Sequence, residues 1–399
     1  MIDKNYVINR SWTEIDLSAL AHNARQIKAL TGPTCEIMGI VKADAYGHGA
    51  CEVAPVLLNN GFTRLAVSLL DEAIALRKSG ITAPILILSY TDPRRAEEII
   101  RYRVTQTVYT WDLIDALEAA GQRLKAYPSV HIKVDTGMSR IGFTSGFSSV
   151  EEIEKIHALK NVFIEGIFTH FSTADEADRI FFDKQAQRFM GICNELESEG
   201  IYIPIKHCCN SAALMRYPEY HLDMVRAGIV TYGILPDFCE SFVDQFRPAM
   251  SIKSNVIMVK HIPAGTAVSY NRRYIAPSER TLATVPIGYA DGYSRVMSGK
   301  AEALIHGMRV PVVGNICMDA CMMDVTDIPE TVEIGDEVVL CGSQNYGDRQ
   351  EFIAMEELAD WHLTITYEVM STVGKRMPRV YVDGGRIIDI HSDILDSGL

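Results

Sequence analysis

The sequence contains few of the features that would place a protein outside the cell or in a membrane. Nine cysteines in 399 residues are too few for a disulfide scaffold, and because the number is odd at least one stays unpaired. No apolar run approaches the roughly 18 residues of a membrane span, and the N-terminal segment has no signal-peptide core. We therefore expect a cytoplasmic protein whose cysteines are small buried hydrophobic residues and hold no metal.

Basic residues are also fewer than acidic residues. The chain has 38 Lys and Arg residues against 51 Asp and Glu residues, a net charge of −13. Nucleic acids and anionic membranes bind basic surfaces, so neither is expected as a partner. Hydrophobic residues, in contrast, make up 48% of the chain, which is typical of soluble globular proteins. The length favours two domains, a barrel of about 250 residues and a smaller unit.

Short β-branched runs alternate with amphipathic segments through the first part of the chain. A helix is expected over residues 16–30 and a first strand over residues 36–42, and the alternation then continues to about residue 229. This pattern favours parallel strands joined by right-handed crossovers, and eight such units close into a TIM-like α/β barrel. An open doubly wound sheet is the alternative.

A different pattern follows residue 246, where strands are separated by turns and one helical segment lies near residues 350–359. We expect the barrel over residues 12–245 and a C-terminal mostly-β domain over residues 246–385. The N-terminal residues 1–11 are expected to join the β-rich domain, and residues 386–399 to form a tail. Because no low-complexity linker separates the two domains, they are expected to pack closely.

Polar residues follow the carboxyl ends of five predicted barrel strands, which is the rim where barrel enzymes collect reactive groups. These residues are Lys42, Arg140, His170, Asn210 with Ser211, and Arg226 with Gly228. Each has an ordinary structural explanation: the lysine reaches solvent, the histidine is buried in the barrel, and the arginines pair with Asp135 and Asp223. Their gathering on one rim nevertheless indicates a functional site.

The seventh and eighth strand–helix loops carry groups suited to a phosphate, the usual phosphate position in barrels. Hydroxyl and backbone N–H groups come from Ser211, Gly228, Ile229 and, from the first loop, Tyr46. A phosphate beside a lysine able to form an imine suggests pyridoxal 5'-phosphate. Gly47 and Gly49 fit this interpretation, because a tight loop must bring the backbone close to the cofactor.

Nine motifs, in order along essentially the whole chain, resemble those of the alanine racemases, pyridoxal-phosphate enzymes of the barrel type. The motifs are "VKADAYGHG", "VHIKVDTGMSRIG", "THFSTADE", "CNSAAL", "VRAGIVTYG", "VSYNRRY", "PIGYADGYSR", "GNICMDACMMDV" and "TITYEV". The resemblance implies an isomerase that interconverts L-alanine and D-alanine and supplies D-alanine for the peptidoglycan of the cell wall. It also implies a homodimer with shared active sites.

The resemblance implies two bases, because racemisation removes the α-proton from one face and returns a proton to the other. Lys42 matches the Schiff-base lysine and the base on one face. Tyr270 matches the other base, donated across the dimer interface by the partner's β domain. Arg226 is implied as the partner of the pyridine nitrogen, which an arginine keeps largely unprotonated.

Further positions are implied by the same resemblance. Arg140 and the Met318 N–H are expected to hold the cofactor phenolic oxygen and the substrate carboxylate, and His170 to pack against the ring. The implied cofactor contacts also include Tyr46, Asn210, Ser211, Gly228, Ile229 and Tyr367. The residues expected behind these contacts are Lys133, His207 and Asp319. The corridor by which substrate enters is implied to contain Asp175, Tyr289, Arg295 and Ile365. Lys133 matches a lysine that carries a carbamate in related enzymes, and an ordinary Lys133–Asp135 interaction is the alternative.

Some positions depart from the family pattern. Asn271 stands where a glycine is frequent, and Asn315 stands where an arginine is expected in the corridor. A serine racemase or a racemase of broader range is therefore an alternative on the same scaffold. A related decarboxylase would need a cysteine-centred loop and a different second domain. A cofactor-binding regulator would lack the β-rich domain and Tyr270.

Overall fold

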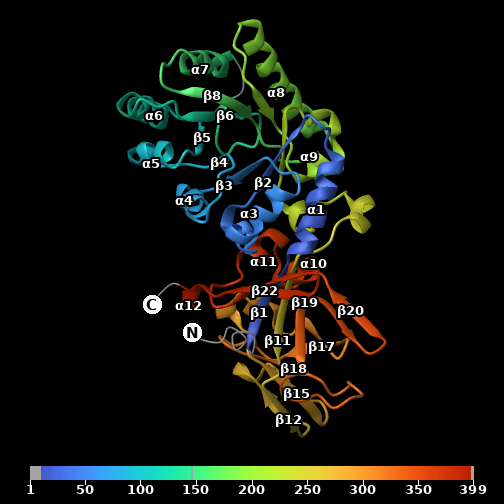
Figure 1. Cartoon of the computed structure of the whole chain (residues 1–399). Coiled ribbons are helices and arrows are strands. Elements are labelled where there is room, and N and C mark those ends of the chain that lie inside the picture. The colour runs from blue at the N-terminus through green and yellow to red at the C-terminus, as the bar shows by residue number, and fades with distance from the viewer. Residues whose placement is uncertain (1–9, 145–146, 397–399) are drawn as a thin grey trace. The chain divides into compact units, whose positions relative to one another are not determined.

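The computed structural model describes residues 10–144 and 147–396, which form two compact units (Figure 1). The barrel unit consists of Ala19–Ala45 and Gly49–Arg247. The β unit consists, among the described residues, of residues 10–18, Tyr46–His48 and residues 248–396. No helix in these described ranges has the length and hydropathy needed to cross a membrane.

Parallel strands form the centre of the barrel unit. They follow one another in the order β10-β2-β3-β4-β5-β6-β8-β9, with the short β7 beside β6. Their bounds are β2 Glu36–Ile40, β3 Arg64–Val67, β4 Ile85–Ile87, β5 Thr105–Val108, β6 Ser129–Asp135, β7 Phe143–Thr144, β8 Phe163–Phe168, β9 Ile205–His207 and β10 Met224–Ala227. The backbone N–H groups of Asp223 and Arg226 donate to the carbonyls of Lys206 and Cys209 and so bridge β9 and β10. The predicted barrel of eight parallel strands is confirmed.

Helices cover the outside of this barrel (Figure 1). They are α1 Leu17–Leu30, α3 Ala50–Asn59, α4 Leu70–Lys78, α5 Ala96–Arg101, α6 Trp111–Leu124, α7 Phe147–His157, α8 Ile180–Ser198 and α9 Ser211–Arg216. Their apolar faces lie inward, as in α6, where Leu113, Leu117 and Ala120 are buried. The strand ends therefore stand on a rigid scaffold.

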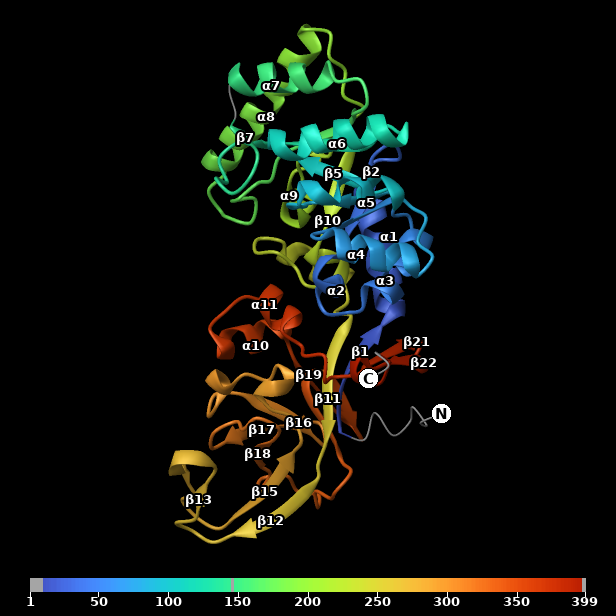
Figure 2. The ribbon, with the colours of Figure 1, turned by 90° about the vertical axis from the view of Figure 1, so that its left-hand side faces the viewer.

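The β unit contains an eleven-stranded sheet in the order β12-β15-β18-β17-β16-β19-β11-β1-β21-β22, with β20 paired to β19 (Figure 2). The bounds are β1 Ser11–Asp16, β11 Met250–Asn255, β12 Met258–Ile262, β15 Arg280–Val285, β16 Glu302–Ile305, β17 Met308–Val313, β18 Cys321–Asp324, β19 Glu337–Tyr346, β20 Arg349–Ile353, β21 Arg379–Asp383 and β22 Arg386–His391. Smaller elements are the hairpin β13 Ala267–Val268 and β14 Tyr274–Ile275, and the helices α10 Met355–His362, α11 Thr366–Ser371 and α12 Asp393–Asp396. The predicted mostly-β C-terminal domain is confirmed.

The edges of the predicted ranges differ from the structure. The barrel was expected to begin at residue 12, whereas β1 pairs antiparallel with β11 and parallel with β21, so its residues belong to the β sheet. The tail expected from residue 386 begins with β22, which pairs with β21. Residues 1–9 of the expected N-terminal extension and residues 397–399 of the tail lie outside the described residues.

Candidate active site

The loop after β2 places Lys42 at the carboxyl end of the strand in a strained backbone. Ala43, Asp44, Ala45 and Tyr46 all have left-handed φ angles, from 51° to 54°. Such a conformation disfavours L-residues by roughly 1–2 kcal/mol each and persists only where the surroundings fix it. The Ala43 N–H donates to Glu72 Oε1 at 2.6 Å, and the Ala50 N–H donates to Asp44 Oδ1 at 2.8 Å. The turn therefore directs the chain sharply away from Lys42.

The half-buried Lys42 amine lies in a cationic environment. Burial lowers its pKa first, Arg140 lowers it further, and Glu72 opposes the shift. A lower pKa increases the fraction of neutral amine, which is the form that attacks a carbonyl or accepts a proton. Lys42 is thus suited to nucleophilic and basic chemistry.

Arg226 occupies the buried centre of the barrel unit. Its Nη1 donates to His207 Nδ1 at 2.9 Å, and its Nη2 donates to the Thr169 carbonyl at 2.9 Å and the Cys208 carbonyl at 3.0 Å. Its Nη2 also lies 3.3 Å from His170 Nδ1. Burial lowers the pKa of Arg226 to about 10, which leaves the guanidinium charged at neutral pH.

The acidic partners considered for the two arginines are used elsewhere. Asp223 accepts the Lys206 N–H at 2.8 Å, and Asp135 accepts the Gly137 and Ser139 N–H groups at 2.9 and 3.1 Å. No described carboxylate forms an ion pair with Arg226. The alternative that Arg226 only forms a structural ion pair with an aspartate is therefore wrong. Its buried charge is available to bind an anion or a hydrogen-bond acceptor.

Four basic side chains lie around His170 and form a cluster. The pKa of His170 is lowered well below the usual value, first by burial and then by Arg226, Arg140, Lys133 and Lys42. Lys42, Arg140 and Arg226 follow or end barrel strands, as the rim position predicts, whereas Lys133 lies within β6. A cluster of this kind favours a bound anion.

Lys133 points into the barrel on β6 and is 3% exposed. Its Nζ donates to the Val134 carbonyl at 2.8 Å and lies 5.4 Å from the centre of the Phe168 ring. Burial, followed by Arg226, lowers the pKa of Lys133 to about 7, with Asp135 opposing. The amine is therefore largely available in its neutral form just above neutral pH.

The loops expected to hold a phosphate are ordered by Ser211 and Asn210. Ser211 Oγ accepts the Gly228 N–H at 3.0 Å and the Val230 N–H at 3.5 Å, which brings the two loops together. Asn210 Oδ1 caps α9 by accepting the Ala213 N–H at 3.0 Å. Ile229 is buried and opens the short 3-10 helix Ile229–Tyr232. The arrangement places a hydroxyl and backbone N–H groups at one point.

Tyr46 and Tyr367 lie together in the β unit, with ring centres 6.0 Å apart. Burial and the neighbouring Tyr367 raise the pKa of Tyr46, so its phenol stays neutral and is able to donate a hydrogen bond. Gly47 has a φ of +81°, and a Cβ there would lie 2.4 Å from the Met370 carbonyl oxygen. Only glycine permits this close approach.

Tyr270 lies at an exposed turn of the β unit, with 64% of its surface accessible. Asn315 Nδ2 donates to the Tyr270 carbonyl at 2.7 Å, and Ser269 Oγ donates to the Asn315 carbonyl at 2.6 Å. Gly314 allows the turn to lie close, because a Cβ there would be 2.8 Å from Ser269 Cβ. The sequence analysis noted Asn315 only as a departure from the corridor pattern. It did not predict the hydrogen bond to Tyr270, because no local feature of the sequence indicates it.

The remaining candidates of the β unit lie around the segment 288–319. The Ala290 N–H donates to the Met318 carbonyl at 3.1 Å, and Asp319 pairs with Arg376 at 2.7 Å. The corridor candidates are all exposed: Tyr289, Arg295 and Ile365 in the β unit and Asp175 in the barrel unit. Within the described residues, no cluster of three or more His, Cys, Asp and Glu side chains is arranged to hold a metal.

Known alanine racemases are similar to this chain over nearly its whole length. The model of the alanine racemase N-terminal domain matches residues 15–236, and the model of the C-terminal domain matches residues 249–381. Alanine racemase 1 of Clostridium acetobutylicum is 46% identical over 385 residues, covering 96% of this chain and 97% of the relative.

Solved structures of amino-acid racemases are similar to this chain as well. The alanine racemase of Clostridium difficile 630 superposes with a TM-score of 0.90 at 40% identity, over 96% of this chain and 98% of that chain. A histidine racemase from Leuconostoc mesenteroides subsp. sake superposes with a TM-score of 0.82 at 32% identity, over 94% and 98%. The barrel with its basic rim, the β-rich second unit and these relatives together identify an amino-acid racemase. The chain belongs to the alanine racemase family, a family of pyridoxal-phosphate-dependent isomerases.

The side chains of the barrel unit suit this cofactor. A buried Arg226 that no described carboxylate neutralises, a lysine of lowered pKa and a hydroxyl beside backbone N–H groups provide complementary contacts for an acceptor nitrogen, an aldehyde and a phosphate.

Proposed function

We propose that this chain racemises alanine with pyridoxal 5'-phosphate, with Lys42 and Tyr270 as the two bases, and that it supplies D-alanine for peptidoglycan. Alanine racemisation is the activity that the family and its solved structures support. The observation that carries the detailed proposal is the buried Arg226, which no described carboxylate neutralises, together with the basic side chains Lys42, Lys133 and Arg140 around His170. A site of this charge binds a phosphorylated cofactor and a substrate carboxylate together.

When bound, the cofactor supplies an aldehyde that links to an amine and a ring that withdraws electron density from the substrate α-carbon. Lys42 provides the amine for this link, and Arg226 donates toward the ring nitrogen. Tyr46, Ser211, Gly228, Ile229 and Tyr367 hold the phosphate, with Asn210 fixing the loop that carries Ser211. Arg140 and the Met318 N–H bind the substrate carboxylate.

Proton transfer then occurs on the two faces of the α-carbon. Lys42 Nζ accepts or returns the proton on one face, and its lowered pKa favours the accepting form. Tyr270 Oη serves the other face. Because Tyr270 is largely exposed on the β unit, we propose that it completes the site of a partner subunit in a homodimer.

The alternative functions on the same scaffold differ from this proposal in the amino acid that they racemise. A solved relative with a similar fold is a histidine racemase, so the scaffold alone does not select alanine. Serine or a broader range of amino acids is the alternative substrate class. Alanine is favoured by the 46% identity to an alanine racemase along nearly the whole chain.

A chiral assay over a panel of L-amino acids, with pyridoxal phosphate present, tests the proposal. We expect D-alanine from L-alanine without carbon dioxide, and slower or no conversion of serine and larger amino acids. We expect Lys42→Ala to lose the covalent cofactor link, seen by absorbance, and at least about a thousandfold in kcat/KM. Release of carbon dioxide would instead identify a decarboxylase, and a linked cofactor without any turnover would identify a regulator.

A further inference from the structure

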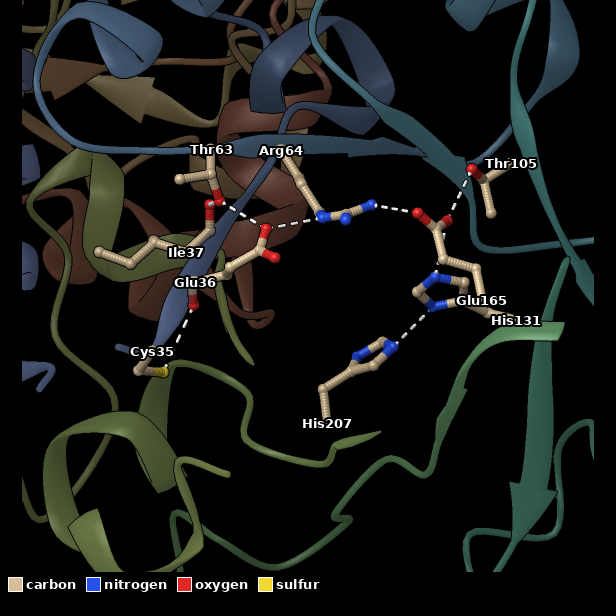
Figure 3. Close-up of polar contacts among 9 residues, drawn as sticks. All are labelled: Cys35, Glu36, Ile37, Thr63, Arg64, Thr105, His131, Glu165 and His207. Atoms are coloured by element: carbon tan, nitrogen blue, oxygen red, sulfur yellow. Dashed lines mark hydrogen bonds and ion pairs between the residues drawn. The ribbon is translucent and has the colours of Figure 1, made fainter. Parts of the chain in front are cut away.

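A row of hydrogen bonds leads from Arg226 through two histidines to Glu165. Arg226 Nη1 lies 2.9 Å from His207 Nδ1. His207 Nε2 lies 2.9 Å from His131 Nδ1, and His131 Nε2 lies 3.2 Å from Glu165 Oε2 (Figure 3). We call these four side chains the Glu165 relay. Both histidines are fully buried, and the Glu165 side chain is 19% exposed. The mechanism above uses only Arg226.

The two ends of the relay fix the protons between them. A guanidinium only donates hydrogen bonds, and an ionised carboxylate only accepts them. His207 Nδ1 must therefore accept from Arg226, which leaves its proton on Nε2. His131 Nδ1 must then accept from His207, which leaves its own proton on Nε2 to donate to Glu165. Each histidine is consequently neutral and carries its proton on Nε2.

The surroundings of the relay support these protonation states. Burial tends to raise the pKa of Glu165, but hydrogen bonds from His131 and Arg64 outweigh it and lower that pKa to about 2. Thr105 Oγ1 also donates to Glu165, at 3.1 Å. Burial lowers the pKa of His131, opposed by Glu165 and assisted by Arg64 and Arg226.

His207 has a similar environment. Its pKa is lowered well below the usual value, first by burial and then by Arg226, His131, Arg64 and Lys133. No carboxylate is among the causes of this pKa shift, so no negative charge would stabilise a protonated His207. A protonated His207 would also present Nδ1–H to the N–H donor of Arg226, and their hydrogen bond would be lost.

Packing holds both rings in the planes that the relay needs. The Phe168 ring stacks on His207 with ring centres 4.7 Å apart and an interplanar angle of 9°. Gly166 faces His131, and a Cβ there would lie 2.6 Å from His131 Cε1. The glycine on β8 therefore makes the space that the imidazole fills.

We propose that Glu165 and His131 are positioning residues for Arg226: they hold His207 as the neutral Nε2–H tautomer, whose Nδ1 keeps the guanidinium charged and in place. The proposal rests on the proposed function, in which Arg226 faces the cofactor ring nitrogen. As a consequence, Glu165 determines the position of Arg226 at the cofactor through two histidines, although it does not contact Arg226 itself.

The decisive variant is Glu165→Gln, which keeps the shape of the side chain but replaces one acceptor with a donor. If the amide oxygen stays with Arg64, its NH₂ group faces His131 Nε2 and favours the reversed tautomer. His207 would then present Nδ1–H to the donors of Arg226, and this contact is lost. The matched control is Glu36→Gln, because Glu36 pairs with Arg64 Nε at 2.7 Å and contacts neither histidine.

The first readout is ¹⁵N NMR of histidine-labelled protein carrying its cofactor, with His131→Gln and His207→Gln used only to assign the signals. We expect both rings to be neutral Nε2–H tautomers in the wild type and in Glu36→Gln, and His207 to gain Nδ1–H character in Glu165→Gln. A wild-type His207 that carries its proton on Nδ1, or on both nitrogens, would overturn the proposal even if the variant failed to fold.

The second readout is steady-state kinetics with alanine. We expect Glu165→Gln to lower kcat by about tenfold or more with a smaller change in KM, and Glu36→Gln to change neither. Equal losses in both variants would show that the charge around Arg64 matters and the relay does not, and would refute the proposal. Because the NMR signature requires no turnover, correct tautomers in a protein without racemase activity would count against the proposed function and leave the relay standing.

Discussion

At the scale of single residues, Lys133 presents a buried amine for which an ion pair with Asp135 was the alternative to a carbamate, and no such ion pair forms. Its Nζ donates to the Val134 carbonyl, and burial with Arg226 lowers its pKa to about 7. Carbon dioxide adds to neutral amines and releases a proton, so the neutral fraction above about pH 7 permits a carbamate. A carbamate would supply a negative charge near Arg140 and Arg226.

We predict that ¹³C-bicarbonate at about pH 8 gives a carbamate signal that Lys133→Met lacks. The sign follows from the lowered pKa: the neutral form increases as pH rises through about 7, so the signal should fade toward about pH 6. A spectrum at about pH 8 that is identical in the two proteins would leave Lys133 as a free amine. Its hydrogen bond to Val134 would then be its complete role.

Residue positions differ in how far the sequence could predict them. Lys42, His170 and Arg226 were placed on the rim by a local rule, since each follows the end of a barrel strand. His131 and Glu165 follow no such rule, because their contact depends on the register of β6 against β8. The sequence has no local signal for such a register. The hydrogen bond from Asn315 was missed for the same reason, because its partner Tyr270 lies 45 residues away.

At the scale of elements, the turn that carries Tyr270 depends on side chains outside itself. Ser269, Asn271 and Arg272 have φ angles of 65°, 60° and 49°, which glycine adopts more readily than these residues do. The bond from Asn315 to the Tyr270 carbonyl therefore acts against a backbone preference.

We predict that Asn315→Ala leaves the cofactor link intact but lowers kcat by about tenfold, because the phenol of Tyr270 is no longer held in one position. The loss should be larger for the enantiomer whose α-proton Tyr270→Phe fails to remove, measured with α-deuterated L- and D-alanine. Asn345→Ala, an exposed asparagine on β19, serves as the control. A loss that is equal for both enantiomers would argue against a role through Tyr270.

Elements with a strong period were predictable, and elements fixed by distant partners were not. The helix α6 and the strand β6 follow directly from their apolar spacing. The left-handed turn after Lys42 was expected only as a glycine loop, since alanine-rich "KADAY" favours ordinary helix. The strand β1 was missed because its partners, β11 Met250–Asn255 and β21 Arg379–Asp383, lie far from it in the sequence.

At the scale of the whole molecule, the exposed Tyr270 is central to the proposed homodimer. A hollow of about 490 Å³ beside it is lined by apolar groups that include Ile262, Val268, Leu282 and Met322. An apolar hollow next to a proposed catalytic group fits the homodimer that we propose. We therefore expect each active site to combine Lys42 of one protomer with the tyrosine of its partner.

Mixing two inactive variants tests this shared site. A hybrid of Lys42→Ala and Tyr270→Ala chains contains one doubly defective site and one site with both wild-type bases. Random exchange of equal amounts makes half of the dimers hybrids, so about a quarter of the wild-type activity should return. Each variant alone should stay inactive, and dilution to sedimentation-verified monomers should abolish the activity of the wild type. If the mixture stayed as inactive as its components after proven subunit exchange, both bases would have to come from one chain.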